Sequence, residues 1–503
     1  MNKSYIIAHD LGTSGTKAVL TDMEGSVIAA AESRYQVHYF ANGGAEQDPE
    51  DWWQAITETT RQIMEKTGIK AEEVAGLSMS AQMAGTLPVD VNGQPLRRAM
   101  IWLDARAETE GEILRKSTGF DFISGKASSA KVFWIKRNEP EVYKQTHKFL
   151  DCKDFLQYRM TGEFATDHSL AIATTYFNPW DRVWWPEVLE AMGVPEDKLP
   201  KLMSSTDIVG KLTSAAADQL GLLEGIPVVS GGGDVPCAVI GSGAISLGRG
   251  HLYLGTSAWI MASSAEFILG AEGVYPSIGC DKDTFTLGGE MDNAGGCLKW
   301  FRENLLGMED EKAAAREDKP IFQYMDDLAL QTPNGADGLL FLPWLWGERS
   351  PLNDDQIRGG FVNLGLNHTK AHMIRAMLEG IGHHLRWIFS AIENAGVDLK
   401  EVNVIGGGAM SSFWLQILAD TTGVKLRQVA GPLDACARGA AMTGAVGLGF
   451  YEDFVAVEKV IKLSGVEFVP NPEHRNLYEK AFNDFRSLYP PLSKIAKGTD
   501  SIE

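Results

Sequence analysis

The chain has 503 residues, of which 44% are hydrophobic and 22% charged, and its formal net charge is −20. This length is more than one hydrophobic core fills and predicts two or more large domains. The acidic balance argues against a nucleic-acid-binding face or an anionic membrane surface as partner, and the lack of an apolar run of about 18 residues predicts no membrane span.

The N-terminal residues and the cysteines indicate the cellular compartment. His9 and Asp10 come before the apolar core of an export signal could form, so no such signal is predicted. The five cysteines are widely scattered without CxxC spacing, which indicates neither a disulfide framework nor a zinc site. They are Cys152, Cys237, Cys280, Cys297 and Cys436. We therefore expect a cytoplasmic protein.

The first predicted elements form a glycine-rich hairpin. Residues 5–8 and 18–20 are apolar runs typical of buried strands, and residues 10–17 between them read Asp-Leu-Gly-Thr-Ser-Gly-Thr-Lys. The turn N–H groups, the hydroxyls and the Lys17 ammonium could converge on an anion, and Asp10 beside them would suit a metal ion. An ordinary glycine-rich hairpin with an exposed Asp10 explains this stretch equally well.

The next elements have the order of an α/β sheet. Residues 26–30 predict a third strand, and Asp48 with Pro49 after it predicts the start of a helix. Residues 74–79 predict a further strand, which ends in a loop where α/β sheets tend to place ligands. Three strands, a helix and a strand indicate a mixed sheet.

A second glycine-rich stretch follows a buried strand predicted at residues 227–230. It reads Gly231-Gly232-Gly233-Asp234 and would place a carboxylate on tightly bent backbone with room beside it. Taken alone, a loop with a solvated Asp234 is the simpler interpretation.

From about residue 247 a second α/β half is predicted. Leu254-Gly-Thr-Ser257 repeats the residues at 11–14, again at a turn between strands. Residues 402–405 predict a strand that leads into Gly406-Gly-Gly-Ala409 and then a helix near residues 413–418. Strand, glycines and helix is a frequent nucleotide-binding arrangement, although neither a dinucleotide fingerprint nor a Walker A loop is present.

Six motifs occur in one order along the chain, and together they resemble the FGGY family of carbohydrate kinases, most closely its xylulokinase branch. They are Asp10-Leu-Gly-Thr-Ser-Gly15, Glu46-Gln-Asp-Pro49, Gly231-Gly-Gly-Asp234, Leu254-Gly-Thr-Ser257, Gly347-Glu-Arg-Ser-Pro351 and Gly406-Gly-Gly-Ala409. The resemblance implies an α/β, actin-like (ribonuclease-H-like) fold of two domains, with ATP and sugar in the interdomain cleft. We expect domains at residues 1–246, on the sugar and phosphate side, and 247–503, on the nucleotide side. Whether the last helices pack back on the first domain is left open.

The resemblance also implies roles for individual residues. Asp10 would hold Mg²⁺ through water, and Asp234 would be the general base that takes the proton of the sugar hydroxyl. The residues expected to bind ATP come from both halves: Gly12, Thr13, Lys17, Gly255, Thr256, Ser257, Gly295, Gly407, Gly408 and Ala409. Those expected to bind the sugar, besides Asp234, are Gln82, Met83 and Ala84.

Three positions depart from the xylulokinase pattern. Ala84 stands where a histidine is usual, and Leu103 and Val235 stand where asparagines are. Each change removes a side chain that could bond a sugar hydroxyl, and such bonds decide specificity. The expected acceptor is a ketopentose such as D-xylulose; another ketose, a polyol or a sugar acid is the alternative.

Two pairs of residues elsewhere are interpreted as structural. His383 and His384 lie on a predicted helix and are expected to be core or solvated residues, not catalytic ones. Glu348 and Arg349 are expected to form a pair that shapes the cleft.

Two other classes of function compete with a sugar kinase. An actin- or Hsp70-like ATPase switch would need a partner-binding domain, and none is recognised after the second half. A catalytically inactive sugar sensor would not need both Asp10 and Asp234. We therefore expect an enzyme that acts on a small sugar or polyol, with a homodimer implied only by the resemblance.

Overall fold

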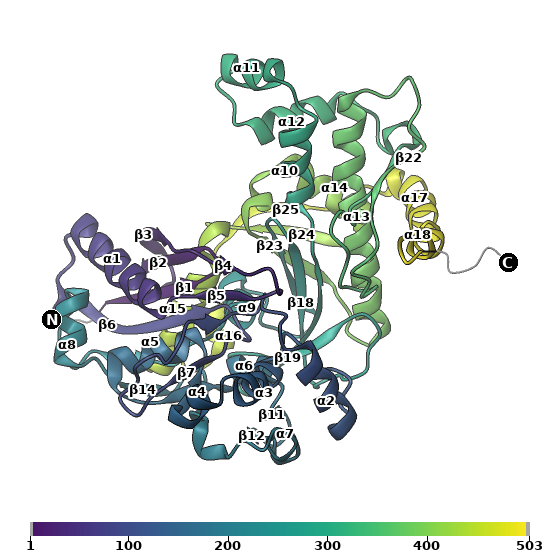
Figure 1. Cartoon of the computed structure of the whole chain (residues 1–503). Coiled ribbons are helices and arrows are strands. Elements are labelled where there is room, and N and C mark those ends of the chain that lie inside the picture. Colours follow the sequence, from purple (N-terminus) through teal and green to yellow (C-terminus); the bar gives the residue numbers. More distant parts are fainter. Residues whose placement is uncertain (1–3, 499–503) are drawn as a thin grey trace. The chain divides into compact units, whose positions relative to one another are not determined.

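The computed structural model describes residues 4–498, which form two compact units that interleave along the chain (Figure 1). Unit 1 comprises the residues up to Ile245 together with Ser277–Phe285 and Asp434–Ile461. Unit 2 comprises Ser246–Pro276, Thr286–Leu433 and the residues from Lys462 onwards. The two domains expected from the sequence, residues 1–246 and 247–503, are continuous segments, and this division remains a prediction. The two units differ from it because two later segments, Ser277–Phe285 and Asp434–Ile461, belong to unit 1.

Unit 1 is built on a seven-stranded mixed sheet with the order β14-β15-β6-β1-β2-β3, in which β16 also pairs with β6. Its strands are β1 (Tyr5–Leu11), β2 (Gly15–Thr21), β3 (Val27–Arg34), β6 (Val74–Ala81), β14 (Ile208–Lys211), β15 (Pro227–Val229) and β16 (Gly232–Gly233). The first two form the expected antiparallel hairpin, and β1 pairs with β6 in parallel. The predicted hairpin and the predicted mixed sheet are confirmed.

Helices cover both faces of this sheet. Successive side chains of its central strand β1 point to opposite faces, so each face contributes to a separate core. Ile7 and Leu11 of β1 pack in the core shared with helix α1 (Pro49–Thr67). Ile6 and Ala8 pack in the core shared with helices α9 (Asp234–Ser242) and α15 (Ala435–Gly447). As predicted, Asp48 caps α1, accepting a hydrogen bond from the Glu50 N–H at 3.1 Å.

Between β6 and β14, unit 1 contains a region of helices and short strands. Its main helices are α2 (Glu108–Thr118), α3 (Ser128–Asn138), α5 (Cys152–Thr161) and α7 (Pro186–Met192). The strand pair β7 (Leu87–Val89) and β9 (Lys148–Leu150) links the loop after β6 to the start of α5.

Unit 2 is built on a second seven-stranded sheet, with the order β19-β20-β18-β17-β23-β24-β25. Its strands are β17 (Arg249–Leu254), β18 (Ala258–Ser264), β19 (Tyr275–Ile278), β20 (Phe285–Met291), β23 (Glu401–Ile405), β24 (Lys425–Val429) and β25 (Leu463–Phe468). A large core joins this sheet to α10 (Gly295–Asn304), α13 (Lys370–Asn394) and α14 (Ser412–Thr422). Strand β17 is paired antiparallel with β18 and parallel with β23, in agreement with the predicted second α/β half.

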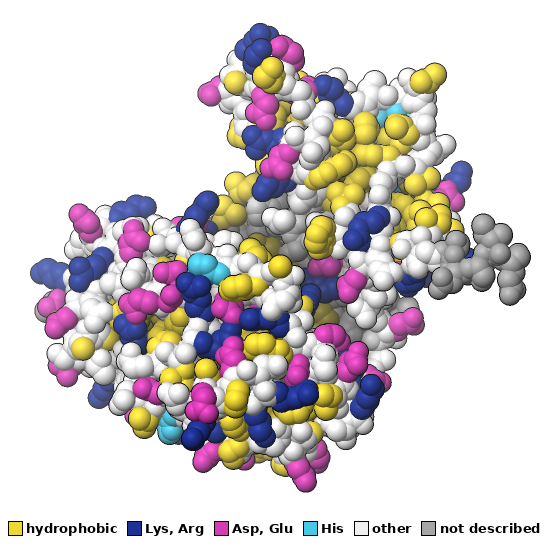
Figure 2. All heavy atoms as spheres, viewed as in Figure 1, with side chains coloured by type: hydrophobic (Ala, Val, Ile, Leu, Met, Phe, Trp, Pro, Cys, Tyr) yellow, Lys and Arg dark blue, Asp and Glu magenta, His cyan; other side chains and the backbone are white. Residues whose placement is uncertain are grey.

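The surface carries charges of both signs. On the face that Figure 2 shows, acidic and basic side chains are interspersed, with no broad basic area like that of a nucleic-acid-binding face. Among the described helices, none is both long enough and apolar enough to cross a bilayer.

Candidate active site

In unit 1, the turn between β1 and β2 is held in one conformation by hydrogen bonds. The Gly12 N–H donates to the Gly15 carbonyl at 2.9 Å, and the Tyr35 hydroxyl donates to the Gly12 carbonyl at 2.6 Å. The Thr13 carbonyl accepts from Gln47 Nε2 at 2.6 Å, and its hydroxyl accepts from the Trp102 indole at 3.0 Å. Because the Thr13 hydroxyl is an acceptor in that bond, its own proton is available to an anion.

Asp10 lies near the end of β1, where the sheet brings three strands side by side. It is the register partner of Ser80 on β6, and Ser80 is in turn the partner of Gly232 on β16. The Ser80 hydroxyl donates to Asp10 Oδ1 at 2.8 Å. Burial raises the pKa of Asp10, while the Ser80 bond and the charge of Lys17 act to lower it.

Lys17 faces two carboxylates within unit 1. Its Nζ lies 3.0 Å from Glu32 and 3.2 Å from Asp434, which directly precedes α15. Burial acts to lower the pKa of Lys17, but these two partners outweigh it and raise the pKa. A phosphate that binds Lys17 would therefore have to compete with these two carboxylates.

Asp234 is the first residue of α9, directly after the glycines of β16. Gly231 has φ +68°, and a Cβ there would come within 1.9 Å of the Met79 carbonyl. A Cβ on Gly233 would come within 2.5 Å of Met83 Sδ. The glycines thus let this strand lie against β6 and the loop after it, and the N–H groups at the start of α9 favour a negative charge there.

Asp10 and Asp234 both lie near Cys436 in the first turn of α15. Burial raises the pKa of the Cys436 thiol well above its ordinary value, and the two carboxylates raise it further. The structure therefore brings the predicted metal ligand and the predicted base around one position. Sequence reasoning missed Cys436, because no pattern in the chain connects it with residues more than 200 positions away.

The predicted sugar-binding residues occupy the loop after β6. The Gln82 N–H donates to the Leu11 carbonyl at 2.7 Å, and Gln82 Nε2 donates to Gln47 Oε1 at 2.7 Å. Gln47 Oε1 also accepts from the Trp52 indole at 3.1 Å. Gln82 Oε1 is buried and has no hydrogen-bond partner within the described part of the chain, so it is an acceptor suited to a ligand hydroxyl.

In unit 2, the second Gly-Thr-Ser turn is joined to the start of α10. The Gly295 N–H donates to the Gly255 carbonyl, and the Gly296 N–H donates to the Thr256 carbonyl, each at 2.9 Å. A Cβ on Gly295 would come within 2.5 Å of the Gly255 carbonyl oxygen. The predicted residues Gly255, Thr256 and Gly295 are therefore in contact, and Ser257 closes the turn by accepting from the Gly255 N–H at 2.9 Å.

The glycine run after β23 lies against the same strand end. Gly406 has φ +87°, and a Cβ on it or on Gly408 would come within 2.7 Å or 2.5 Å of Leu254. A Cβ on Gly407 would meet no described atom within 4 Å, so this position is open to a ligand. The Ala409 carbonyl accepts from Gln428 Nε2 at 2.6 Å.

The predicted helix after this run is present as α14 (Ser412–Thr422), which begins one residue before the predicted residues 413–418. Residues Gly407–Met410 form a 3₁₀ turn, and Ser411 caps α14 by accepting from the Trp414 N–H at 3.0 Å. The Ser411 hydroxyl also donates to Asp326 Oδ2 at 2.6 Å, and burial raises the pKa of Asp326 to about 6. Gly407 and Gly408 thus lie in a 3₁₀ turn that precedes the helix N-terminus.

Glu348 and Arg349, also in unit 2, have different surroundings. Arg349 Nε donates to Asp292 Oδ1 at 2.7 Å, and its guanidinium also pairs with Glu290. Glu348 is fully buried and accepts from the N–H groups of Asp292 and Arg349, each at 3.0 Å. Burial raises the pKa of Glu348 to about 8.

The two predicted structural histidines are buried on α13, which confirms the structural interpretation. His384 Nδ1 lies 3.1 Å from the Trp344 indole nitrogen, and its Nε2 lies 2.7 Å from the Ser350 carbonyl. Because an indole N–H only donates and a carbonyl only accepts, the proton of a neutral His384 is on Nε2. Burial lowers its pKa to about 4.

The buried carboxyl of Glu348 should make stability depend on pH. Its pKa is raised above the ordinary value of 4.5, so the folded state holds a proton that the unfolded state releases. The unfolding free energy should therefore fall by up to about 1.4 kcal/mol per pH unit between about pH 5 and pH 8. Urea unfolding across this range measures it, and Glu348→Gln should flatten the profile. An identical profile in the variant would contradict the assignment.

The residues around Asp10 fit a magnesium ion. Mg²⁺ commonly takes one or two carboxylates, several waters and substrate phosphates, at hard oxygen ligands. Asp10 offers one carboxylate, and it lies directly before the glycine-rich turn that is predicted to bind the phosphates. In the part of the chain that the structure describes, no group of three or more His, Cys, Asp or Glu side chains could hold a metal by itself.

Known families, relatives and solved structures match this chain over nearly its whole length. Residues 5–241 match the N-terminal domain, and residues 250–448 the C-terminal domain, of the FGGY family of carbohydrate kinases. The chain is 33% identical to xylulose kinase from Bacillus subtilis over 497 residues, which cover 96% of both chains. It is 29% identical to gluconokinase from the same organism, covering 98% of this chain and 96% of the other. The crystal structure of ligand-bound xylulose kinase from Lactobacillus acidophilus superposes with a TM-score of 0.87 at 26% identity, over 98% of this chain and 99% of that chain.

Proposed function

This chain belongs to the FGGY family of carbohydrate kinases, and we propose that it phosphorylates a ketopentose such as D-xylulose, with Asp234 as the general base. That it is a sugar kinase follows from the family. The acceptor, the base and the nucleotide-binding residues are the proposed part.

The placement of Asp234 carries the proposal. It stands at the N-terminus of α9, preceded by a glycine that packs against Met83 of the predicted sugar loop, and it shares the neighbour Cys436 with Asp10. A base in this position would lie between the acceptor loop and the phosphate turn. This is the arrangement that transfer between a hydroxyl and a phosphoryl group requires.

The proposed step balances as follows. The acceptor hydroxyl oxygen forms a bond to the terminal phosphorus of ATP, the bond from that phosphorus to the ADP oxygen breaks, and the hydroxyl proton passes to the Asp234 carboxylate. Thr13 and the backbone N–H groups of the turn would orient the phosphates. Mg²⁺, when bound, would spread the charge of the phosphates, and Asp10 would hold it through water.

The pairing of two arginines around Glu46 favours an uncharged acceptor over a sugar acid. Arg106 Nη2 lies 2.6 Å from both Glu46 and Asp104, and Arg97 also pairs with Glu46. Both arginines are therefore neutralised by carboxylates within the protein. The gluconokinase relative supports the sugar acid as the alternative.

An acceptor panel tests the proposed function. ADP release from Mg·ATP would be measured with ketoses, polyols and sugar acids beside a blank without sugar. We expect D-xylulose to stimulate turnover well above the blank. Stimulation by gluconate alone would replace the proposed acceptor, and turnover that ignores every sugar would favour an ATPase switch.

Two expectations from the sequence stay predictions. These are the cytoplasmic location and the homodimer, and light scattering of the purified protein would measure the second.

A further inference from the structure

The loop that carries the predicted sugar-binding residues contains a strained backbone position. Ala84 has φ +62°, in the left-handed region that residues other than glycine rarely adopt. Such a conformation persists only where the surrounding structure holds it, and it is often found at functional sites.

Three buried side chains hold the backbone at this position. Lys131 Nζ donates to the Ala84 carbonyl at 2.8 Å, and Asp151 Oδ2 accepts from the Gly85 N–H at 2.8 Å. The Ser128 hydroxyl donates to the Gly85 carbonyl at 3.0 Å. We call these three side chains, Ser128, Lys131 and Asp151, the loop clamp.

The loop clamp is attached to rigid elements. Ser128 and Lys131 lie on α3, and Asp151 caps α5, where it also accepts from the Cys152 N–H at 2.7 Å. Helices hold side chains more firmly than loops do. The strained loop is thus tied to two helices at once.

Lys131 also joins two predicted parts of the sugar pocket. Besides Ala84, its Nζ donates to the Ile101 carbonyl at 2.7 Å, two residues before Leu103. Burial lowers the pKa of Lys131 to about 7, although the charges of Asp104 and Asp151 act to raise it. Even the neutral amine has two protons, one for each of its carbonyl partners.

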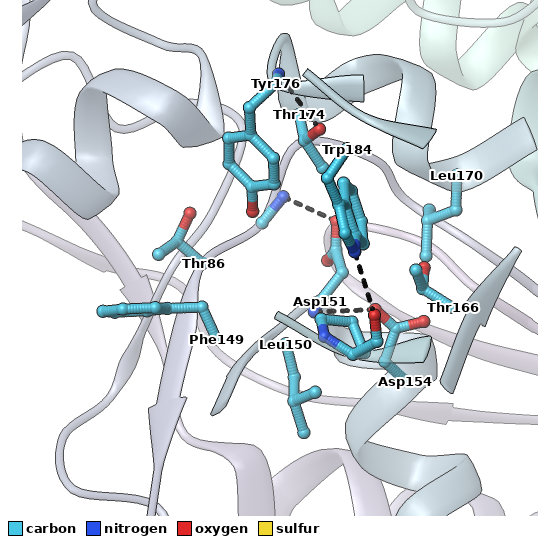
Figure 3. Close-up of a pocket in the computed structure, with 12 residues that line it drawn as sticks. Thr86, Phe149, Leu150, Asp151, Asp154, Thr166, Leu170, Thr174, Tyr176 and Trp184 are labelled. Atoms are coloured by element: carbon cyan, nitrogen blue, oxygen red, sulfur yellow. Dashed lines mark hydrogen bonds between the residues drawn. The ribbon is translucent and has the colours of Figure 1, made fainter. Parts of the chain in front are cut away.

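A small cavity lies beside the two residues that follow Ala84, Gly85 and Thr86. Figure 3 shows a small cavity bordered by Thr86, Asp151, Asp154 and Tyr176, with a volume of about 10 Å³ for the centre of a water-sized sphere. That is room for about one water molecule. Thr86 Oγ1 and Asp154 Oδ1 are buried without a hydrogen-bond partner among the residues described. Beside this cavity, the hydrogen bonds of the loop clamp hold the backbone at residues 84 and 85.

We propose that Lys131 is a positioning residue for the sugar. It holds Ala84 in the left-handed conformation and fixes the position of the loop at residues 82–84 relative to the segment at residues 101–104. This inference rests on the proposed function, since it requires the loop to contact the acceptor. Its consequence is that loosening Lys131 weakens recognition of the sugar more than that of ATP.

Steady-state kinetics of the full-length protein test this inference. Lys131→Met removes both bonds and keeps the length of the side chain. We expect the KM for the acceptor to rise about ten-fold or more while the KM for ATP changes less than about two-fold. Lys136→Met is the matched control, because Lys136 lies on the same helix and donates to the carbonyls of Met192 and Gly193 instead. It should leave both constants unchanged.

A double-mutant cycle with Ala84→Gly separates positioning from a general structural role. Glycine adopts the left-handed conformation without strain, so the loop should need Lys131 less. In the Ala84→Gly background, the effect of Lys131→Met on the acceptor KM should shrink by about three-fold or more. Equal effects in the two backgrounds, or equal changes in the KM for ATP and for the acceptor, would overturn the proposal.

A milder variant covers the case in which Lys131→Met does not fold. Ser128→Ala removes one bond of the loop clamp and should raise the acceptor KM by about two- to five-fold; no change would count against the loop clamp.

Wild-type protein in the same assay separates the two proposals. If no sugar stimulates it, the proposed function fails and this inference with it, whereas normal wild-type kinetics with unchanged variants overturns the loop clamp alone.

Discussion

Asparagine in place of Asp234 is expected to lower kcat by about 10²–10⁴-fold while ATP binding is kept, because the amide cannot take the proton of the attacking hydroxyl. The substitution preserves size and an acceptor for the Val235 N–H, which now donates to Asp234 Oδ1 at 2.8 Å. The first turn of α9 should therefore stay folded.

The measurement is kcat with saturating acceptor, beside the dissociation constant of ATP from calorimetry. Asp218→Asn is the matched control, since Asp218 is an exposed acid on α8 (Ser214–Leu220) of the same unit. It should change neither quantity. A near-normal kcat in Asp234→Asn would remove this residue from the mechanism, and a parallel loss of ATP binding would indicate a damaged fold.

Gly439→Ala is expected to cost about 3 kcal/mol or more of stability, because it overpacks a contact between two backbones. Helices α9 and α15 cross where a Cβ on Gly439 would come within 1.8 Å of the Cys237 carbonyl oxygen. A Cβ on Gly241 would likewise come within 1.8 Å of the Ala435 carbonyl. Neither backbone can give way as a flexible side chain would, so the helices must separate.

Thermal unfolding measures this effect, and we expect Tm to fall by roughly 10 °C. Because Asp234 begins α9, kcat should fall as well at temperatures where the variant is still folded. Gly68→Ala is the control: Gly68 has φ +66°, and a Cβ there would meet no described atom within 4 Å, so this variant reports conformational strain alone, about 1 kcal/mol. Equal losses in the two variants would contradict the close helix contact.

Local patterns predicted the elements near the site well. The apolar run before Asp10 and the capping pair at Asp48 and Pro49 occur as expected, and the strand predicted at residues 74–79 is present but extends to Ala81. Each of these features depends on residues close together in the chain, such as an apolar run or an N-cap residue. Such local patterns can be recognised in the sequence alone. The motif residues therefore lie at the ends of the expected elements.

Contacts between distant segments could not be predicted in the same way. Lys17 pairs with Asp434, and Cys436 lies near Asp10 and Asp234, although more than 400 residues separate the hairpin from α15. Helix α15 is rich in alanine and glycine, and its composition fits either unit. Its core contacts with Ile6 and Ala8 and the close approach of Gly439 to α9 show that it packs in unit 1.

The sequence by itself determined the family, the order of the elements and the positions of the glycines and carboxylates that phosphoryl transfer uses. The tertiary structure alone decided which groups surround them. Ala84 illustrates the difference: its replacement of a polar residue is visible in the chain, but its strained backbone depends on Lys131 and Asp151. A lysine that donates to two carbonyls leaves no local pattern, because its partners are set by how helices pack on loops and not by neighbours in the chain.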